Sequence, residues 1–403
     1  MESTVKPKKQ SLEIGIIGGP FDRITTVLDE FEPGQKDFIR PLESFDVKPR
    51  RVTDVVEREV EIKVPARLHS TVFDMNRFNL NRAGGGGIGI GIQVYFNAKV
   101  RSLKEPKFVL KGERTLIMEH FCHIFKELLG YPGGFEIELQ DHKRRHVGLG
   151  SSIGSMVAAC IGINEVLGRP FNGRELRRII GYHSCEESPH GNGYLMPAFE
   201  TGMGAMVGVN GGWIIGTDDL EMVYRVPLPD TKCIVFIPDV PTLEDEFTGK
   251  ETAAESEVEL LLRRARTLDT LQTGVKAQLV LYDMIPAMIK NDLRGIGNTM
   301  FDLAFLGSKR AECEQHGSYG APIYKYISTF REIGAEVVGM SSVGPTIFAL
   351  TRCDDTYDRV LKYLHSQNIP ESRIIETAVD NVGSRIIENG EERVFTADGW
   401  LQG

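Results

Sequence analysis

Glycine and hydroxyl residues are concentrated between His146 and Met156, in the order His-Val-Gly-Leu-Gly-Ser-Ser-Ile-Gly-Ser-Met. Glycine lets a backbone approach a ligand closely and turn its N–H groups inward. An apolar run with helical spacing follows, to Leu167, so we expect a helix whose positive N-terminal end faces an anion. Three basic residues, at 143–145, lead into the loop. The segment predicts a cradle for a phosphorylated ligand; the alternative is a glycine-rich turn that caps an ordinary helix.

Two further segments carry glycines and polar residues. The first comprises Pro65–Asn76 and the glycines Gly84–Gly87, and the second is Gly339–Leu350. In the first, Arg67 and His69 alternate on a predicted strand and therefore share one of its faces. The glycine run then joins this strand to a second one, predicted over residues 88–100.

Composition limits the classes of partner. The chain has 403 residues and a formal net charge of −9, which disfavours general binding to nucleic acid or to an anionic membrane. Its six cysteines show no zinc-type spacing, and most stand in apolar surroundings, so we expect buried thiols. No signal-type stretch or bilayer-length apolar run is present, and a cytoplasmic enzyme is expected.

The remaining pattern mixes strands and helices without a regular alternation, which indicates an α+β fold. We expect an N-terminal extension over residues 1–55, a phosphate-binding lobe over 56–220 and a second lobe over 221–403. Helices are predicted over 114–129, 174–184 (capped by Asn172), 257–289, 292–306, 323–333 and 355–366, and strands over 60–64, 135–139, around 205–215, and over 233–238, 336–339, 346–351 and 372–378.

The three glycine-bearing segments, in this order, resemble the GHMP kinase superfamily, and most closely the beta-ribofuranosylaminobenzene 5'-phosphate synthase family. The matching residues are Ala66–His69 with Asp74 and Asn76, Gly85–Gly86, His146 with Gly148–Ser151, Ala198–Glu200, Met284–Ala287, Leu306–Gly307, Ser341–Ile347 and Asp380–Gly383. They span residues 60–388 and leave the N-terminal extension unexplained. The resemblance implies a GHMP kinase-like fold of two lobes around a phosphate loop. The N-terminal lobe would resemble the second domain of ribosomal protein S5, and the C-terminal lobe would be an α/β sandwich.

The resemblance also implies an activity. Such a synthase condenses phosphoribosyl pyrophosphate with an aromatic or heteroaromatic acid, such as 4-aminobenzoate, and releases CO2 and pyrophosphate. The product is a C-riboside that serves methanopterin or C-nucleoside synthesis. A homodimer is implied, with no nucleic-acid or membrane partner, and Mg2+ as the cofactor.

The chain departs from the synthases at two places. Ser152-Ile153-Gly154 stand where the synthases usually carry Gly-Thr-Gln, and are closer to the kinases. Residues 187–197 stand where the synthases carry a glycine-rich run, so the identity of the aromatic acceptor stays open. The aspartate that many superfamily kinases carry next to the accepting hydroxyl would fall in Tyr194–Pro197, which contains none. An ATP-dependent small-molecule kinase is therefore the second hypothesis, and a ligand-binding regulator on the same scaffold is the third.

We expect Asp74, His69 and Glu200 to be the catalytic residues. Asp74 could act on ribose, metal or a proton, or form an Asx turn with Asn76. His69, like Arg67, suits an anion but also a surface ion pair. Glu200 could ligate a metal or pair with a buried arginine.

The remaining predicted residues bind substrate or metal. By resemblance to the kinases, Ser152 and Glu186 are the expected magnesium ligands. His146 could contact phosphate or cap the loop, and His190 could be a turn residue. The expected substrate-binding residues are Arg67, Asn76, Gly85, Gly86, Arg145, His146, Gly148, Leu149, Gly150, Ser151, Ser152, His190, Ser342 and Gly344.

Overall fold

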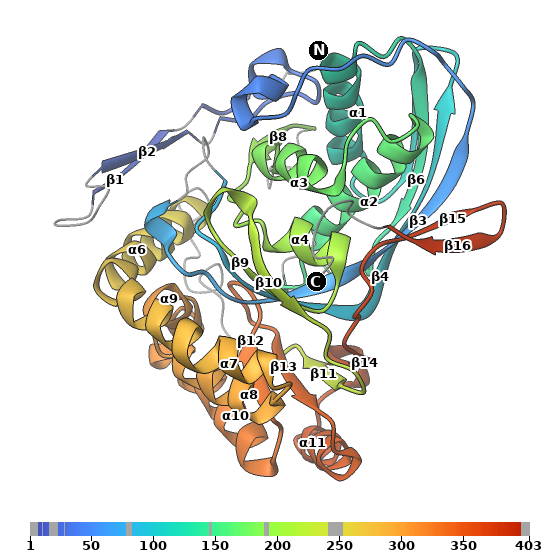
Figure 1. The fold of residues 1–403 in the computed structure, drawn as a ribbon. Coiled ribbons are helices and arrows are strands. Elements are labelled where there is room, and N and C mark those ends of the chain that lie inside the picture. The colour runs from blue at the N-terminus through green and yellow to red at the C-terminus, as the bar shows by residue number, and fades with distance from the viewer. Residues whose placement is uncertain are drawn as a thin grey trace.

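The computed structural model describes residues 7–9, 11–15, 23–27, 29–77, 83–144, 147–188, 193–240 and 253–395. Within them the chain forms two α+β lobes, one above the other in Figure 1. The expected α+β class is confirmed. No helix in these ranges combines the length and the apolar character that crossing a membrane requires.

An eight-stranded sheet is the centre of the first lobe. Long strand β4 pairs with β9 at one end and with β6 at the other, and its whole length runs beside β3. The strands, along the sheet, are β10 (Met222–Val226), β9 (Trp213–Gly216), β4 (Gly87–Leu103), β3 (Glu59–Thr71), β15 (Arg385–Glu388) and β16 (Glu391–Val394). Strand β6 (Gly134–Gln140) pairs with the C-terminal half of β4, and β5 (Phe108–Gly112) pairs with β6.

Four helices accompany this sheet: α1 (Thr115–Leu129), α2 (Ser151–Val166), α3 (Gly173–Tyr182) and α4 (Met203–Asn210). Every residue of α2 is buried, because it lies against β3 and β4 on one side and against α1, α3 and α4 on the others. A helix that is apolar all round needs such a position. The predicted cap of α3 is confirmed as a capping box between Asn172 and Glu175.

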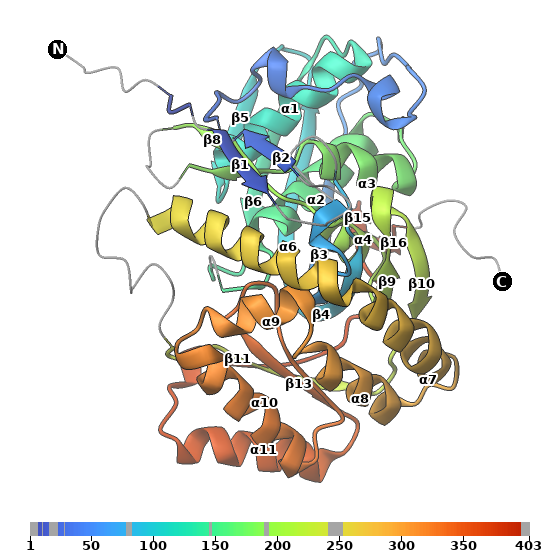
Figure 2. The same ribbon diagram turned by 90° about the vertical axis from the view of Figure 1, so that its left-hand side faces the viewer.

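The second lobe contains a four-stranded antiparallel sheet and a group of helices (Figure 2). Its strands, in spatial order, are β12 (Val337–Met340), β13 (Ile347–Thr351), β11 (Lys232–Phe236) and β14 (Ile374–Ala378). Its helices are α6 (Ala253–Leu279), the π-helix η5 (Val280–Met284), α7 (Ile285–Ile289), α8 (Leu293–Leu303), α9 (Gly307–Glu314), α10 (Ala321–Ile333) and α11 (Asp354–Ser366). The long helix predicted over 257–289 is thus interrupted by one π turn.

Shorter elements connect these parts. They are the hairpins β1 (Ser11–Gly15) with β2 (Arg23–Val27) and β7 (Cys185–Glu187) with β8 (Leu195–Pro197), and the 3-10 helices η1 (Lys36–Phe38), η2 (Leu42–Phe45), η3 (Met75–Arg77), η4 (Asp218–Leu220), η6 (Ser318–Gly320) and η7 (Glu371–Arg373). Residues 31–47 of the predicted extension lie on the first lobe, because Phe31, Leu42 and Phe45 are buried in its core.

The strands predicted around 205–215 are wrong in part. Residues 203–210 form helix α4, and only 213–216 are a strand. The segment is short, apolar and rich in glycine, and such a run has no periodicity that separates a buried helix from a buried strand.

The last two described strands return to the first lobe. Strand β15 pairs with β3, and β16 with β15, while β10 also lies in the first sheet. In sequence, the strands of the second lobe's sheet therefore lie within residues 232–378. Strands of the first sheet both precede and follow them.

We predict that Ile386→Ala lowers the free energy of unfolding by about 2–5 kcal/mol, the usual range for a fully buried isoleucine. Ile386 is fully buried in β15 and belongs to the first lobe's core. Ile387→Ala is the matched control, because this neighbour is only half-buried. Urea unfolding of both variants measures the difference, and equal losses would contradict the return of the chain to this core.

Candidate functional site

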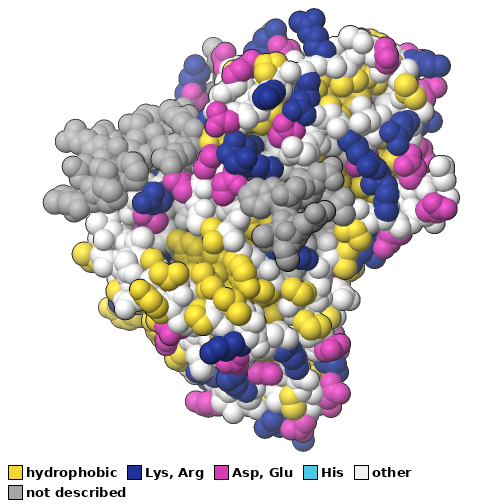
Figure 3. Space-filling model, in the orientation of Figure 1, with side chains coloured by type: hydrophobic (Ala, Val, Ile, Leu, Met, Phe, Trp, Pro, Cys, Tyr) yellow, Lys and Arg dark blue, Asp and Glu magenta, His cyan; other side chains and the backbone are white. Residues whose placement is uncertain are grey.

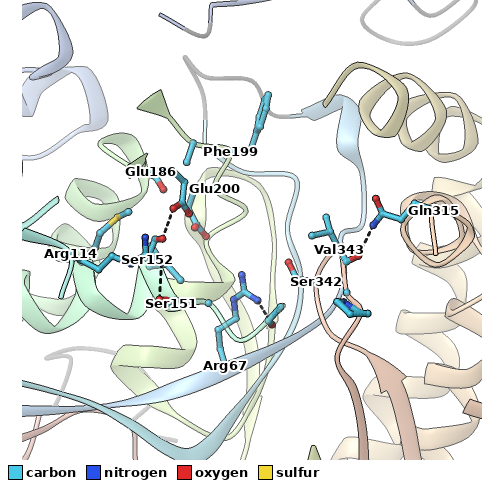
Figure 4. A pocket seen from close by; sticks show the side chains of 18 of the residues that line it. Arg67, Arg114, Ser151, Ser152, Glu186, Phe199, Glu200, Gln315, Ser342 and Val343 are labelled. Atoms are coloured by element: carbon cyan, nitrogen blue, oxygen red, sulfur yellow. Dashed lines mark hydrogen bonds between the residues drawn. The ribbon is translucent and has the colours of Figure 1, made fainter. Parts of the chain in front are cut away.

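A pocket of about 280 Å³ lies between the two lobes (Figure 4). The N-terminal end of α2 and the neighbouring β7 form its first-lobe side, and residues near α9 and the β12–β13 turn form the other. The lining residues are Arg67, Arg114, Gly148, Gly150, Ser151, Ser152, Ile153, Met156, Ser184, Glu186, Ala198, Phe199, Glu200, Gln315, His316, Ser342, Val343, Gly344 and Pro345.

Two glycines give the loop before α2 its conformation. Gly148 and Gly150 have φ of 89° and 70°, in the region that side chains rarely adopt. A Cβ on Gly148 would come within 2.4 Å of the carbonyl oxygen of Ser341, so the space beside this residue is already filled. The sequence therefore needs glycine here both for the turn and for the close approach of the second lobe.

The first turn of α2 is open to an anion. Gly150 is its N-cap residue and has no side chain that could accept from the first backbone N–H groups. Arg67 from β3 lies beside this turn and donates from Nη1 to the carbonyl of Gly148 at 3.3 Å. Its buried Nε has no partner among the described residues. An N-terminal helix turn and a guanidinium whose Nε is unpartnered together have the chemistry that binding a phosphate group requires.

The three glycine-bearing segments meet at Ser341. Its hydroxyl accepts from the backbone N–H of His69 at 3.0 Å and donates to the carbonyl of Gly148 at 2.6 Å. The next residue, Ser342, donates its N–H to the carbonyl of His69 at 2.6 Å. Segments that are far apart in sequence are thus joined by direct hydrogen bonds.

The two serines of the loop point to different partners. Ser151 donates to Asp141 at 3.0 Å and accepts from Arg114 at 2.9 Å, and Arg114 also pairs with Glu187 at 3.1 Å. Ser151 therefore fixes the start of α2. Ser152 instead donates to Glu186 on β7, inside the pocket (Figure 4).

Two carboxylates of the pocket influence each other. Burial raises the pKa of Glu200 above its usual value, while nearby Arg67 opposes the shift and Glu186 adds to it. Glu200 also accepts from the N–H of Gly202 at 2.6 Å. Magnesium sites use one or two carboxylates together with substrate phosphates, so Ser152 and Glu186, near Glu200, have suitable chemistry. The described residues contain no cluster of three or more His, Cys, Asp or Glu that could hold a metal by itself.

Many of the predicted site residues line this pocket. They are Arg67, Gly148, Gly150, Ser151, Ser152, Glu186, Glu200, Ser342 and Gly344. Leu149 is buried in the core beneath the loop instead. Arg145, His146 and His190 lie outside the described residues.

His69 is not among the lining residues. Its ring is buried, and a Cβ on Gly87 would lie 3.0 Å from its Nε2. Burial lowers the pKa of His69 well below its usual value, with further lowering from Arg67 and Lys309, so the ring is neutral. Through its backbone, which bonds to Ser341 and Ser342, it positions the loop.

Asp74 and Asn76 form a local turn under α6. Asp74 accepts from the backbone N–H and the side-chain amide of Asn76, both at 3.0 Å, as in an Asx turn. Asn76 also donates to the carbonyl of Arg266 at 3.2 Å. Neither residue lines the pocket. Gly85 and Gly86 lie against β9 and η4, since Gly85 approaches Asp218 and a Cβ on Gly86 would meet the carbonyl of Gly216.

The sequence patterns missed several lining residues, chiefly Arg114, Gln315 and His316. Phe199 lies in the matching motif Ala198–Glu200 but was not among the expected site residues. Arg114 was visible only as a helix start, and its bond to Ser151 depends on how α1 packs beside α2. Gln315 and His316 follow α9, whose position against the β12–β13 turn has no local signal. Both contact the carbonyl of Val343.

Comparison with known proteins bears on both the fold and the site. Residues 284–370 match the family model "GHMP kinases C terminal". Beta-ribofuranosylphenol 5'-phosphate synthase from Archaeoglobus fulgidus is 26% identical over 349 residues, which cover 81% of this chain and 99% of the relative. The chain is related to these synthases. The enzyme of that name from Methanothermobacter thermautotrophicus is 25% identical over 313 residues, covering 73% of this chain and 89% of the relative. The resemblance predicted from the motifs is confirmed.

Solved structures show the same fold. Mevalonate diphosphate decarboxylase from Staphylococcus aureus superposes with a TM-score of 0.59 at 16% identity, over 83% of this chain and 99% of that one. Homoserine kinase from Cytophaga hutchinsonii superposes with a TM-score of 0.54 at 16% identity, over 82% of this chain and 98% of that one. The GHMP kinase-like fold is therefore confirmed.

We predict that Gly150→Val abolishes binding of inorganic pyrophosphate. The new side chain would require a strained backbone at φ 70° and would meet Arg67 at 3.2 Å. Gly168→Val is the matched control, because Gly168 has φ 80° at the other end of α2 with open space around its Cβ position. Titration calorimetry should show no binding for the first variant and unchanged binding for the second. Unchanged affinity in Gly150→Val would refute the phosphate cradle.

Proposed function

We propose that this protein is a decarboxylating C-ribosyltransferase that condenses phosphoribosyl pyrophosphate with an aromatic acid. The observation that carries the proposal is the phosphate cradle of Gly148–Ser152 and Arg67, in a chain related over most of its length to beta-ribofuranosylphenol 5'-phosphate synthases. The name of these relatives specifies a ribosylated phenol, so we take 4-hydroxybenzoate as the first acid to test and 4-aminobenzoate as the second.

The proposed reaction needs no protein nucleophile. The ring carbon that bears the carboxylate forms a bond to the anomeric carbon. The bond between the anomeric carbon and pyrophosphate breaks at the same time. The bond between the ring and the carboxylate then breaks, CO2 leaves, and its electron pair restores the aromatic ring. The enzyme has to position the reactants and stabilise charge.

The pocket residues divide this work. The first N–H groups of α2 and the guanidinium of Arg67 bind phosphate oxygens and stabilise the leaving pyrophosphate. The carboxylate of Glu200 lies at the same pocket and, when ionised, favours the positive charge that develops on the ribosyl carbon. Gln315 and Ser342 close the opposite side of the pocket from the second lobe.

We further propose Mg2+ as the cofactor, held by Ser152 and Glu186. The support is their direct contact within the pocket and the nearby second carboxylate of Glu200. A bound Mg2+ would neutralise charge on the leaving pyrophosphate.

The deciding experiment supplies the protein with Mg2+, phosphoribosyl pyrophosphate and 4-hydroxybenzoate or 4-aminobenzoate labelled in the carboxylate. We expect labelled CO2 and pyrophosphate in equal amounts, and no product without the acid. A parallel reaction with ATP and candidate alcohols tests the kinase hypothesis. ADP formation without any consumption of phosphoribosyl pyrophosphate would contradict the proposal.

We also propose that the protein is a homodimer, with a second copy on the exposed apolar face of α6, η5 and α7. The large side chains Leu271, Val275, Leu281, Tyr282 and Ile289 are all exposed there. Figure 3 shows hydrophobic side chains gathered on the face of the molecule on which Figure 1 labels α6 and α7. A contiguous apolar face of this kind is typical of a protein interface.

Replacing Tyr282 by glutamate should convert the dimer to a monomer, because it places a charge in the proposed interface. Tyr319→Glu is the matched control, since Tyr319 is 85% exposed but lies outside the face, in η6. Light scattering coupled to gel filtration measures the mass of each. A wild-type monomer, or a dimer that survives Tyr282→Glu, would exclude this interface.

A further inference from the structure

A second pocket, of about 210 Å³, adjoins the first. The two share Ser184, Ala198 and Glu200, so Glu200 lies at their junction. The remaining lining residues are Phe31, Asp37, Phe38, Arg40, Ala83, His120, Gly181, Tyr182, His183 and Pro197. Four of them come from residues 31–40, which precede the part of the chain that resembles the synthases by its motifs.

Aromatic rings supply much of the wall. Phe31 and Phe38 stack with their centroids 4.0 Å apart and their planes 9° from parallel. His120 meets Phe31 edge-on at 5.0 Å, and Tyr182, at the end of α3, also lines the pocket. A wall made of aromatic rings favours a flat aromatic ligand, which can stack on one ring and meet another by its edge.

The polar groups of this pocket are held in fixed orientations. His183 accepts from the backbone N–H of Arg40 at 3.0 Å and contacts the carbonyl of Ile179 through its other nitrogen at 2.7 Å. His120 accepts from the N–H of Gly34 at 3.1 Å. Burial lowers the pKa of His183 to about 4 and that of His120 to about 3, so both rings are neutral. They carry no charge that could hold an anion at neutral pH.

Arg40 is the cation of the pocket. Its guanidinium carbon lies 5.8 Å from the centroid of Tyr182. Arg40 is partly buried, and this burial lowers the pKa of its guanidinium from the usual value. Its exposed neighbour Asp37 also lines the pocket. A partly desolvated guanidinium gains more from an anionic ligand than one in water does.

We propose that this second pocket binds the aromatic ring of the acceptor, with Arg40 facing the ring substituent opposite the carboxylate. This assignment rests on the proposed function. In that reaction the carbon that bears the carboxylate has to reach the ribosyl carbon in the first pocket. The opposite end of the ring therefore extends away from the junction at Glu200, toward residues that belong to the second pocket alone.

This geometry makes Arg40 a specificity-determining residue. A guanidinium beside a phenol oxygen favours the phenolate, whose electron pair adds density to the ring carbon opposite it. That carbon is the one that forms the new bond. The phenol proton passes to solvent water as the phenolate forms, and a proton from water returns to the oxygen of the product once CO2 has left and the ring is restored. An amino group gains no such benefit, because its reactive form is neutral. The pocket therefore favours a hydroxylated over an aminated acid.

The experiment compares Arg40→Met with Lys36→Met, its matched control. Lys36 is exposed in η1 of the same segment and does not line the pocket. We expect Arg40→Met to lower kcat/KM for 4-hydroxybenzoate by about tenfold or more, the equivalent of one lost charge-assisted hydrogen bond. The loss for 4-aminobenzoate should be smaller, and the KM for phosphoribosyl pyrophosphate should not change. Lys36→Met should behave as the wild type.

Two results would overturn the assignment. One is an equal loss with both acids, and the other is a raised KM for phosphoribosyl pyrophosphate with unchanged use of the acids. Should Arg40→Met fail to fold by circular dichroism, Arg40→Lys takes its place, and because it keeps the charge it should retain the preference for the hydroxylated acid.

Failure of the proposed function is detected separately. A wild-type protein that releases neither CO2 nor pyrophosphate with either acid rejects the reaction, but not the pocket. Calorimetric titration of 4-hydroxybenzoate then tests the pocket alone. Binding to the wild type and Lys36→Met, but not to Arg40→Met, supports an aromatic-acid site; equal binding or no binding to all three rejects it.

Discussion

The hydroxyl of Ser341 holds three separate parts of the chain at one point. Its two partners, the N–H of His69 and the carbonyl of Gly148, are backbone groups, and Ser341 is fully buried. A buried peptide group that loses its partner costs about 1–3 kcal/mol. Because His69 lies two residues after Arg67 and Gly148 begins the phosphate loop, this side chain of the second lobe sets the distance between the arginine and the loop.

Around that point the site keeps charges that are incompletely paired. Burial lowers the pKa of Arg67 even though Glu200, Glu312 and Glu186 oppose the shift. The same burial raises the pKa of Glu200. Buried charges are stable only when paired and hydrogen-bonded, so such a cluster favours ligands that bring both an anion and a cation. The phosphorylated ligand and the cation proposed for this pocket would complete that pairing, although the chain as a whole is negative.

The sequence predicted the features that depend on local chemistry. The glycines of the loop, the apolar helix α2 and the Asn172 cap each follow from neighbouring residues, and the structure contains all three. The sequence did not predict features that depend on packing between distant segments. Helix α4 was predicted as a strand, and no local pattern indicated Arg114, Gln315 or Arg40 as pocket residues. Asp74 illustrates the limit, since its predicted role and its Asx turn with Asn76 share one sequence pattern, and only the fold shows where the carboxylate lies.

The return of β15 to the first sheet has a consequence for how the protein is made. Strand β3, near the start of the first lobe, pairs along one edge with residues 385–387. During synthesis that edge stays without its partner until the second lobe has emerged from the ribosome. Open edges of this kind are sites of misassembly between chains. The first lobe is thus the earlier of the two to be synthesised and the later of the two to be completed.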